Sequence, residues 1–180
     1  MKYEVIFSGF GGQGIVTSAV ILGRAASMYD GKYAVQSQSY GPEARGGASS
    51  STVIISEDPV HYPKVFNPNI YVIMSEAGYL KFGSTASDQD IVIIDSGLVQ
   101  SRPEGVSCRK IPATALSKEE LGKPIVANIV MLGALVATTG IVSPEAMQKA
   151  VLDIVPKGTE ELNKKALHLG IKLGSGEQKP

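Results

Sequence analysis

The sequence has little cysteine: Cys108 is the only one among its 180 residues. A single thiol excludes a disulfide within the chain. An iron–sulfur cluster held wholly by this chain would need about four cysteines, so any redox metal must belong to a partner protein. We expect Cys108 to be a half-buried structural thiol, because no neighbouring pattern indicates an activated thiolate.

The chain also lacks an excess of charge of either sign. Lys plus Arg and Asp plus Glu number 17 each, so the formal net charge is zero. No strong field is therefore available to attract nucleic acid or an anionic membrane, and we expect neither as a partner. The sequence begins directly with an apolar strand rather than with a secretion signal, so we expect a cytoplasmic protein.

One uncharged stretch, Ile125 to Val142, is nearly long enough to span a bilayer. Asn128 and Gly133 interrupt it, and Ser143-Pro144 follows it as a helix start. We therefore predict a buried helix and no membrane span. A helix that is apolar nearly all round must be covered on every side, so part of the cover is expected from another chain, and a homodimer of the isolated protein is compatible with it.

Signatures of an independent catalyst are missing as well. The sequence has no G-x-S-x-G elbow, and neither His61 nor His168 is placed near a nucleophile. A lone histidine in an irregular loop such as that of His61 is more often exposed than a metal ligand. A hydrolase is therefore disfavoured.

The most prominent feature present is a glycine-rich turn after an apolar strand at Tyr3 to Phe7. Gly9, Gly11 and Gly14 stand in the G-x-G-x-x-G register that opens a nucleotide-binding strand–turn–helix unit. The first glycine allows a sharp turn, the second a close approach of backbone to an anion, and the third close packing of helix on strand. A helix from near Ile15 would point its N-terminal N–H groups at a phosphate. A purely structural turn remains the alternative.

The end of the second predicted strand, Lys32 to Gln38, weakens the nucleotide interpretation. The strand–helix–strand order predicts a right-handed crossover into a parallel pair with the first strand. A dinucleotide-binding domain carries an acidic residue at the end of that second strand. Here Val35 to Ser39 contains no carboxylate, and Asp30 lies before the strand, in the turn. An NAD site therefore loses its second support.

A second glycine-rich segment follows at once. Gly41-Pro42 and Gly46-Gly47 break regular structure on both sides of Glu43 and Arg45. The loop is expected at the carboxyl edge of the parallel sheet, the same edge as the first turn, where ligands bind in open sheets. Arg45 could bind a phosphate or a carboxylate. A local Glu43–Arg45 surface pair of little energetic weight is the alternative.

The remaining patterns predict a single α/β domain with a Rossmann-like, mainly parallel sheet flanked by helices. It covers residues 1–174, and a polar, mobile tail follows at 175–180. Further strands are predicted at residues 51–56, 70–74, 90–96 and 106–111, and helices at 76–82, from 117, at 128–139, from 144 and at 159–173. Asp95 is expected to cap the turn that follows it, and Ser117 to start its helix as a capping box. Asn128 is expected to cap its helix, with contact to a ligand as the alternative.

The two glycine motifs in this order, Tyr3 to Gly14 and Tyr40 to Gly47, resemble the gamma subunit of the thiamine-diphosphate-dependent 2-oxoacid:ferredoxin oxidoreductases. The resemblance covers most of the chain. It implies a non-catalytic subunit of an enzyme that oxidises pyruvate, 2-oxoglutarate or 2-oxoisovalerate. The chain has no Gly-Asp-Gly motif for diphosphate and magnesium. Thiamine diphosphate, Mg and iron–sulfur clusters would therefore lie in alpha, beta and ferredoxin-like delta subunits, with ferredoxin as acceptor and 2-oxoglutarate as the favoured substrate.

The resemblance also implies a place beside the path of coenzyme A. The residues expected to form this path or a partner surface belong to the two motifs and the apolar helix. They are Gly9, Phe10, Gly11, Gly12, Gln13, Gly14, Tyr40, Gly41, Pro42, Glu43, Arg45, Gly46, Gly47 and Asn128. Two other functions stay open: a stand-alone nucleotide- or flavin-binding oxidoreductase, and a cofactor-free assembly or regulatory protein.

Overall fold

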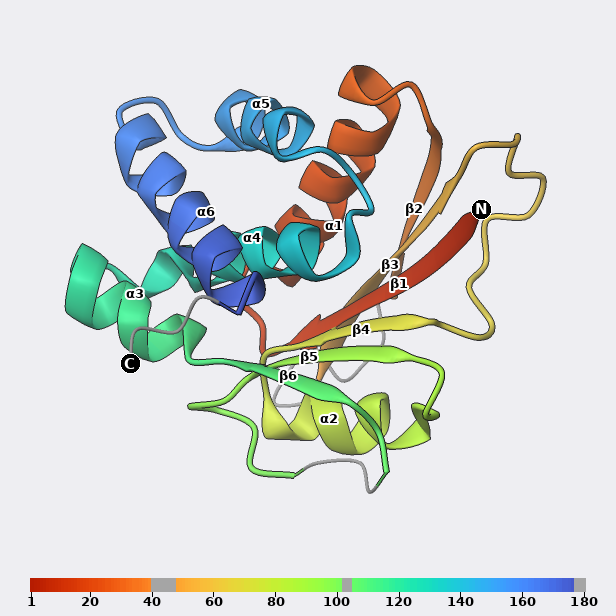
Figure 1. Ribbon diagram of the computed structural model, residues 1–180, viewed down its shortest axis with the longest axis horizontal. Coiled ribbons are helices and arrows are strands. Elements are labelled where there is room, and N and C mark those ends of the chain that lie inside the picture. Colours follow the sequence, from red (N-terminus) through yellow and green to blue (C-terminus); the bar gives the residue numbers. More distant parts are fainter. Residues whose placement is uncertain (40–47, 102–104, 177–180) are drawn as a thin grey trace.

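The chain folds around a six-stranded sheet of order β2-β3-β1-β4-β5-β6 (Figure 1). The computed structural model describes residues 1–39, 48–101 and 105–176. The strands are β1 (Lys2–Gly9), β2 (Tyr33–Ser39), β3 (Ser49–Ser56), β4 (Ile70–Ile73), β5 (Ile91–Asp95) and β6 (Cys108–Ile111). The pairs β1–β4, β4–β5 and β5–β6 are parallel, which confirms the predicted mainly parallel α/β fold.

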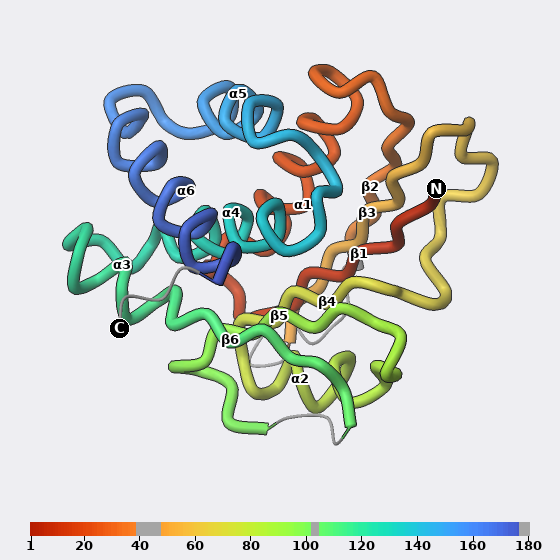
Figure 2. Tube along the Cα trace, in the orientation of Figure 1, coloured from red at the N-terminus to blue at the C-terminus, as the bar shows by residue number. Residues whose placement is uncertain are grey.

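The helices lie on both faces of this sheet, in unequal layers (Figure 2). They are α1 (Ile15–Arg24), which continues into a π-helical turn (Ala25–Tyr29), α2 (Glu76–Lys81), α3 (Ala113–Leu121), α4 (Ala127–Thr139), α5 (Pro144–Ile154) and α6 (Glu160–Gly174). The larger core joins α1, α4, α5 and α6 to one face of the sheet. On the opposite face, α2 covers a smaller cluster that includes Ile6, Tyr71 and Ile94.

The predicted pairing of the first two strands is wrong. β3 lies between β1 and β2 and runs antiparallel to both, with Val53 opposite Val5 and Gln36. The connection from Ser39 to Ser49 is shorter than the dozen or so residues that a parallel crossover needs, so the chain returns as an antiparallel strand. The crossover from β1 through α1 therefore places β2 two positions away from β1 in the sheet, and β3 fills the position between them.

The apolar helix is covered by this chain itself. Residues Ala127 to Val136 of α4 are all buried, and α1, α3, α5 and α6 pack around the helix. The expected cover by another chain is thus wrong for α4, and among the large apolar residues of the uncharged stretch it is Ile125, just before the helix, that is exposed, at 73%. Among the residues that the structure describes, no helix is long and apolar enough to cross a membrane.

Two local predictions differ at the helix starts. α3 begins at Ala113, four residues before Ser117, because the Asp95 carboxylate accepts a hydrogen bond from the N–H of Thr114 and fixes the first turn there. Ser117 lies inside the helix, with a buried hydroxyl that has no partner among the described residues. The helix predicted at residues 159–173 spans Glu160–Gly174, and its N-cap residue Thr159 makes no side-chain cap because its hydroxyl donates to the carbonyl of Pro156.

The closest packing in the helix layer joins α4 to α6 through glycines. A Cβ atom at Gly133 would lie 2.8 Å from the backbone nitrogen of Ile171, and one at Gly174 would lie 2.6 Å from the carbonyl oxygen of Ala134. A Cβ at Gly170 would overlap the carbonyl of Val130. These neighbours are backbone atoms of packed helices, so they cannot move aside as a flexible side chain would.

The α4–α6 contact predicts opposite signs for two helical glycine substitutions. Gly133→Ala should lower the free energy of unfolding by about 1–3 kcal/mol or more, because the methyl group overpacks the contact. Gly23→Ala in α1 should raise it by up to about 1 kcal/mol, because its Cβ would meet only Val53, at 3.9 Å, and alanine restricts the unfolded chain. Urea denaturation measures both. Equal effects at the two positions would contradict this packing.

Candidate functional site

The strands that carry the two glycine motifs end at the same edge of the sheet. Gly9, the last residue of β1, is opposite Ser49, and Ser39, the last residue of β2, is opposite Ser50. Both motifs therefore leave from the carboxyl edge, as their spacing predicts. Of the second motif, Tyr40, Gly41, Pro42, Glu43, Arg45, Gly46 and Gly47 lie outside the described residues, as do residues 177–180 of the predicted tail.

The Gln13 side chain closes the first glycine turn from inside. Its Oε1 accepts a hydrogen bond from the Phe10 N–H at 2.6 Å, and its Nε2 donates to the Met74 carbonyl at 2.9 Å. Because Met74 directly follows β4, Gln13 joins the turn to the neighbouring strand. Gly9 makes room for this arrangement, since a Cβ there would overlap Gln13 Oε1 and lie 2.7 Å from Ile15 Cδ1. A side chain at Gly9 would therefore displace Gln13 from its bond with Phe10 or move the buried end of Ile15.

Gly14 is also required internally. Its φ of 76° lies in the left-handed region, where it forms the N-cap of α1. A Cβ there would lie 2.8 Å from Cγ of Asn128, which α4 brings against the turn. The Asn128 amide contacts the Gly14 carbonyl and the Ser18 hydroxyl, each at 3.4 Å, and Asn128 is only 6% exposed.

The prediction that Asn128 caps its own helix is wrong. The N-cap residue of α4 is Val126, which makes no side-chain cap. Asn128 instead joins α4 to the first turn of α1, where Ser18 also donates to the Gly14 carbonyl at 3.0 Å. The sequence placed Asn128 at a helix start but carried no signal for this contact, which spans 114 positions.

Gly11 and Gly12, in contrast, face open space. A Cβ at either position would meet no atom within 4 Å, and only Gly12 has a positive φ, 88°. Phe10 beside them is 45% exposed. Gly11 therefore needs to be glycine neither for its backbone angle nor for packing within the described residues.

The start of α1 is suited to an anion. α1 has no side-chain cap and no acidic residue in its first turn, so the helix dipole there is not compensated by a carboxylate of that turn. Beside it lies a groove of about 350 Å³ between the starts of α1 and α4, the end of α5 and the start of α6. Gly12, Gly14, Thr17 and Asn128 line the groove together with apolar residues such as Ile129 and Leu162. The α5 and α6 residues of this groove were not predicted, because only tertiary packing brings them to the turn.

Asp95 and Glu76 brace the same carboxyl edge from within. Asp95 is fully buried, and its two oxygens accept hydrogen bonds from the Gly97 N–H and from the N–H and hydroxyl of Thr114. This confirms the predicted capping role. Glu76 at the start of α2 accepts bonds from the Ser101 hydroxyl and from the N–H groups of Gln100 and Ser101. The bonds from Ser101 and Gln100 hold the pKa of the Glu76 carboxyl below its usual value.

The strand order and Asp30 argue against a dinucleotide site of the usual kind. Because β3 intervenes, the end of β2 lies two strand spacings, or about 10 Å, from the glycine turn. A residue there cannot reach a ribose seated on the turn. Asp30, the nearest carboxylate in the sequence, accepts hydrogen bonds from the N–H and hydroxyl of Ser143 at 2.6 and 2.7 Å. It holds the start of α5 instead.

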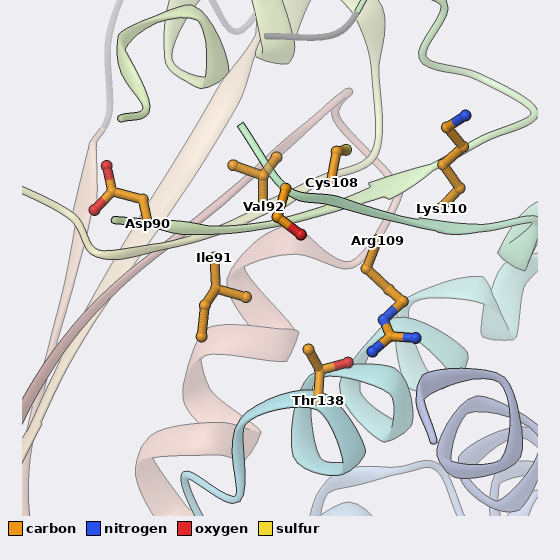
Figure 3. A pocket seen from close by; sticks show the side chains of 8 residues that line it. Asp90, Ile91, Val92, Cys108, Arg109, Lys110 and Thr138 are labelled. Carbon is orange, nitrogen blue, oxygen red and sulfur yellow. The ribbon is translucent and has the colours of Figure 1, made fainter. Parts of the chain in front are cut away.

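A separate cavity of about 630 Å³ lies at the amino ends of β5 and β6, away from the glycine turn (Figure 3). Arg109 points from β6 toward Thr138 of α4. Lys110 and the half-buried Cys108 lie on the opposite face of the strand. His61 is exposed in its loop, as predicted. Among residues 1–39, 48–101 and 105–176, no group of three or more His, Cys, Asp or Glu side chains could hold a metal ion.

Fold and turn together define a single α/β domain with a mainly parallel sheet flanked by helices and a glycine turn at its carboxyl edge. Residues 4–173 match the family model of pyruvate ferredoxin/flavodoxin oxidoreductase. The 2-oxoglutarate synthase subunit KorC of Methanocaldococcus jannaschii is 53% identical over 176 residues, covering 96% of this chain and 94% of that subunit. The pyruvate synthase subunit PorC of Methanothermobacter thermautotrophicus is 36% identical over 171 residues and 92% of each chain.

A solved structure agrees with these sequence matches. The gamma subunit of keto/oxoacid ferredoxin oxidoreductase from Geobacter sulfurreducens superposes with a TM-score of 0.87 at 43% identity, over 97% of this chain and 99% of that one. The chain therefore belongs to the pyruvate ferredoxin/flavodoxin oxidoreductase family. Within it, the chain is of the gamma-subunit type, which confirms the resemblance drawn from the glycine motifs.

The lowered pKa of Glu76 predicts a pH-dependent contribution to stability. The folded carboxyl titrates below its unfolded value of about 4.3, so its stabilisation is complete above that value and is lost as pH falls through the folded pKa. Glu76→Gln should lower the free energy of unfolding at pH 7 by about 1 kcal/mol, because the charge-assisted bonds are weakened. The difference in the free energy of unfolding between Glu76→Gln and wild type should shrink toward pH 3. Urea titrations at both pH values measure it.

Glu119→Gln provides the matched control for this prediction. Glu119 is exposed on α3 and makes no hydrogen bond or ion pair within the part of the chain that the structure describes. Its substitution should change stability little at either pH. If the loss of stability in Glu76→Gln stays constant from pH 7 to pH 3, the charge of the Glu76 carboxylate does not stabilise this edge.

Proposed function

We propose that this chain is a non-catalytic subunit of a 2-oxoglutarate:ferredoxin oxidoreductase. In such a reaction, 2-oxoglutarate, coenzyme A and oxidised ferredoxin give succinyl-coenzyme A, carbon dioxide and reduced ferredoxin. The 53% identity to a 2-oxoglutarate synthase subunit supports this substrate over pyruvate, for which the identity cited above is 36%. The electron sink for decarboxylation would be thiamine diphosphate, with Mg and iron–sulfur clusters, on the alpha, beta and ferredoxin-like delta subunits.

The contribution of this chain is to hold one wall of the coenzyme A path or of the subunit interface. The observation that carries this proposal is the contrast among the glycines: side chains of Gln13 and Asn128 fill the space beside Gly9 and Gly14, whereas a Cβ at Gly11 would meet no atom of the described residues within 4 Å. A phosphate group of coenzyme A, or a carboxylate of a companion subunit, fits beside Gly11 and Gly12 at the uncapped start of α1. The adjoining groove would take an apolar part of the same ligand.

The second motif extends this surface. Glu43 and Arg45 follow β2, which ends at the same sheet edge as the glycine turn. We assign to Arg45 an ion pair with a phosphate or a partner carboxylate. Tyr40, Gly41, Pro42, Gly46 and Gly47 belong with it to the partner surface. Phe10, exposed on the first turn, adds an apolar contact of the kind enriched at protein interfaces.

The two other functions have weaker support. A stand-alone nucleotide- or flavin-binding oxidoreductase would use the glycine turn alone, without a ribose-binding carboxylate, because Asp30 is engaged by Ser143. A cofactor-free assembly protein would explain Gly9 and Gly14 equally well, but it gives no reason for the open Gly11.

Isolation of the untagged complex from its native host distinguishes these functions. We expect the chain to co-purify with thiamine- and cluster-bearing subunits, and the preparation to reduce ferredoxin when both 2-oxoglutarate and coenzyme A are added. Mass spectrometry and the visible absorption of the clusters identify the companions. A bound flavin without companion chains, or an assembly free of any cofactor, would replace the proposal by the corresponding alternative.

Gly11→Val tests the open turn directly. Stability should stay within about 0.5 kcal/mol of wild type, because the described residues leave room for the new side chain. Turnover with coenzyme A, or assembly with the companion subunits, should fall about tenfold or more, because the branched side chain blocks close approach. Urea denaturation of the chain and steady-state kinetics of the reconstituted complex give the two readouts.

Gln89→Val is the matched control, since Gln89 is an exposed turn residue on the far edge of the sheet, between α2 and β5. It should leave stability, assembly and turnover unchanged. Full assembly and activity of the Gly11→Val complex would exclude Gly11 from the coenzyme A path and from the interface.

A further inference from the structure

The face of the sheet that α2 covers becomes polar toward β2 and β3. α2 packs against β1 and β4, over a cluster of apolar side chains that includes Ile6. Ile6 is opposite Thr52 of β3, and Thr52 is opposite Ser37 of β2. Because directly opposed side chains share a face of the sheet, Thr52 and Ser37 continue this face beyond α2. Ser50 lies on it too, since it is two residues from Thr52 along the strand.

A loop lies against these hydroxyl groups and forms a pocket with them. The loop joins β3 to β4, and the Ser37 hydroxyl holds it by donating to the Pro63 carbonyl at 3.1 Å. The pocket has a volume of about 250 Å³, and Ser50 and Thr52 line it from the sheet and Lys64 from the loop. None of the described residues that line it carries a carboxylate. Its surroundings are therefore polar and positively charged.

The Ser50 hydroxyl is the group in this pocket that most needs a ligand. Ser50 is only 7% exposed, and its hydroxyl has no hydrogen-bond partner among residues 1–39, 48–101 and 105–176. Neighbouring buried serines differ in this respect. Ser8 donates to the Ser49 carbonyl at 3.1 Å, and Ser51 donates to the Ser37 carbonyl at 3.0 Å. A buried hydroxyl without a partner lowers stability, and a ligand that accepts a hydrogen bond would supply the partner of Ser50.

The other two polar groups fit a tetrahedral anion. The side chains of Thr52 and Lys64 make no hydrogen bond or ion pair within the part of the chain that the structure describes, and the Lys64 ammonium lies 5.3 Å from the centroid of the Phe66 ring. Ser50 and Thr52 are about 7 Å apart along β3, so one tetrahedral group between them can accept from both hydroxyls while Lys64 approaches from the loop. Lysine binds phosphate as a point charge, whereas a planar carboxylate is matched best by the fork of an arginine.

We propose that Ser50, Thr52 and Lys64 bind a phosphoryl group on this face of the sheet. The same chemistry serves a free phosphate ion and the phosphoryl group of a nucleotide. The pocket shares no lining residue with the groove beside the start of α1. Binding here is therefore independent of the role proposed for Gly11, and either can fail without the other.

Titration of the full chain with sodium phosphate, followed by amide NMR, tests the site. The amide signals of Ser50, Thr52 and Lys64 should shift and saturate with phosphate, but not with sodium chloride at equal ionic strength. Lys64→Gln should weaken phosphate binding about tenfold or more, because a charge-assisted hydrogen bond is lost. Lys118→Gln removes the same charge from an exposed position of α3. It is the matched control and should leave phosphate binding unchanged.

Ser50→Ala separates binding from folding. This substitution should weaken phosphate binding about twofold to tenfold, because one neutral hydrogen bond is lost. The urea midpoint of the phosphate-free chain should stay the same or rise, because the hydroxyl has no partner there to lose. Ser8→Ala, on the same face of the sheet, should do the opposite. It should lower the urea midpoint, since the bond to the Ser49 carbonyl is lost, and leave phosphate binding unchanged.

Adenosine 5′-monophosphate distinguishes the two sources of the phosphoryl group. Tyr62 and Phe66 of the same loop stack with ring centroids 5.6 Å apart, and both are more than 60% exposed. Exposed aromatic rings are the usual platform for a base. If the phosphoryl group comes from a nucleotide, adenosine 5′-monophosphate should bind more tightly than phosphate and lose this advantage in Phe66→Ala. Equal affinities for both probes, unaffected by Phe66→Ala, would assign the site to the free ion.

Three results would overturn the proposal. One is the absence of any shift up to about 100 mM phosphate, a concentration that nearly saturates a site with a Kd of about 10 mM. Another is phosphate binding that both Lys64→Gln and Ser50→Ala leave unchanged. The third is tighter binding of acetate than of phosphate at equal ionic strength, which would show that the pocket selects a planar anion.

Discussion

The antiparallel return of β3 is the constraint on which the rest of the structure depends. The connection after Ser39 is too short for a crossover, so β3 must pair with β2 as a hairpin and then fills the place beside β1. This insertion keeps the carboxyl ends of β1 and β2 at one edge of the sheet, yet separates the end of β2 from the first glycine turn by two strand spacings. The loss of a ribose-binding position and the place of β2 at the outside of the sheet have this one cause.

The first glycine turn combines two kinds of glycine that look alike in the sequence. Gly9 and Gly14 are fixed by their neighbours, because Gln13 and Asn128 occupy the space that a side chain would need. At Gly11 a Cβ would meet no atom of the described residues within 4 Å. Part of the G-x-G-x-x-G register therefore serves to join β1, β4 and α4, so the register by itself does not indicate a bound dinucleotide.

The remainder of the carboxyl edge is built to be rigid rather than reactive. The carboxylate oxygens of Asp95 and Glu76 accept hydrogen bonds from the backbone and hydroxyl groups of neighbouring segments. Asp30 does the same at the start of α5. These bonds fix the backbone at this edge of a chain whose family belongs to ferredoxin oxidoreductase complexes that use thiamine diphosphate and iron–sulfur clusters.

The sequence by itself determined the fold class, the order of the elements and the sheet edge at which the first glycine turn lies. Apolar runs such as Ile91 to Asp95, and glycines between a strand and a helix, are local signals with a direct physical meaning. It could not determine the place of β3 in the sheet, the role of Asn128, or which glycines are free. Those features arise from contacts between segments far apart in the chain, such as Asn128 with Gly14. Only tertiary packing decided them, because a local pattern records what a segment can form and not what lies beside it.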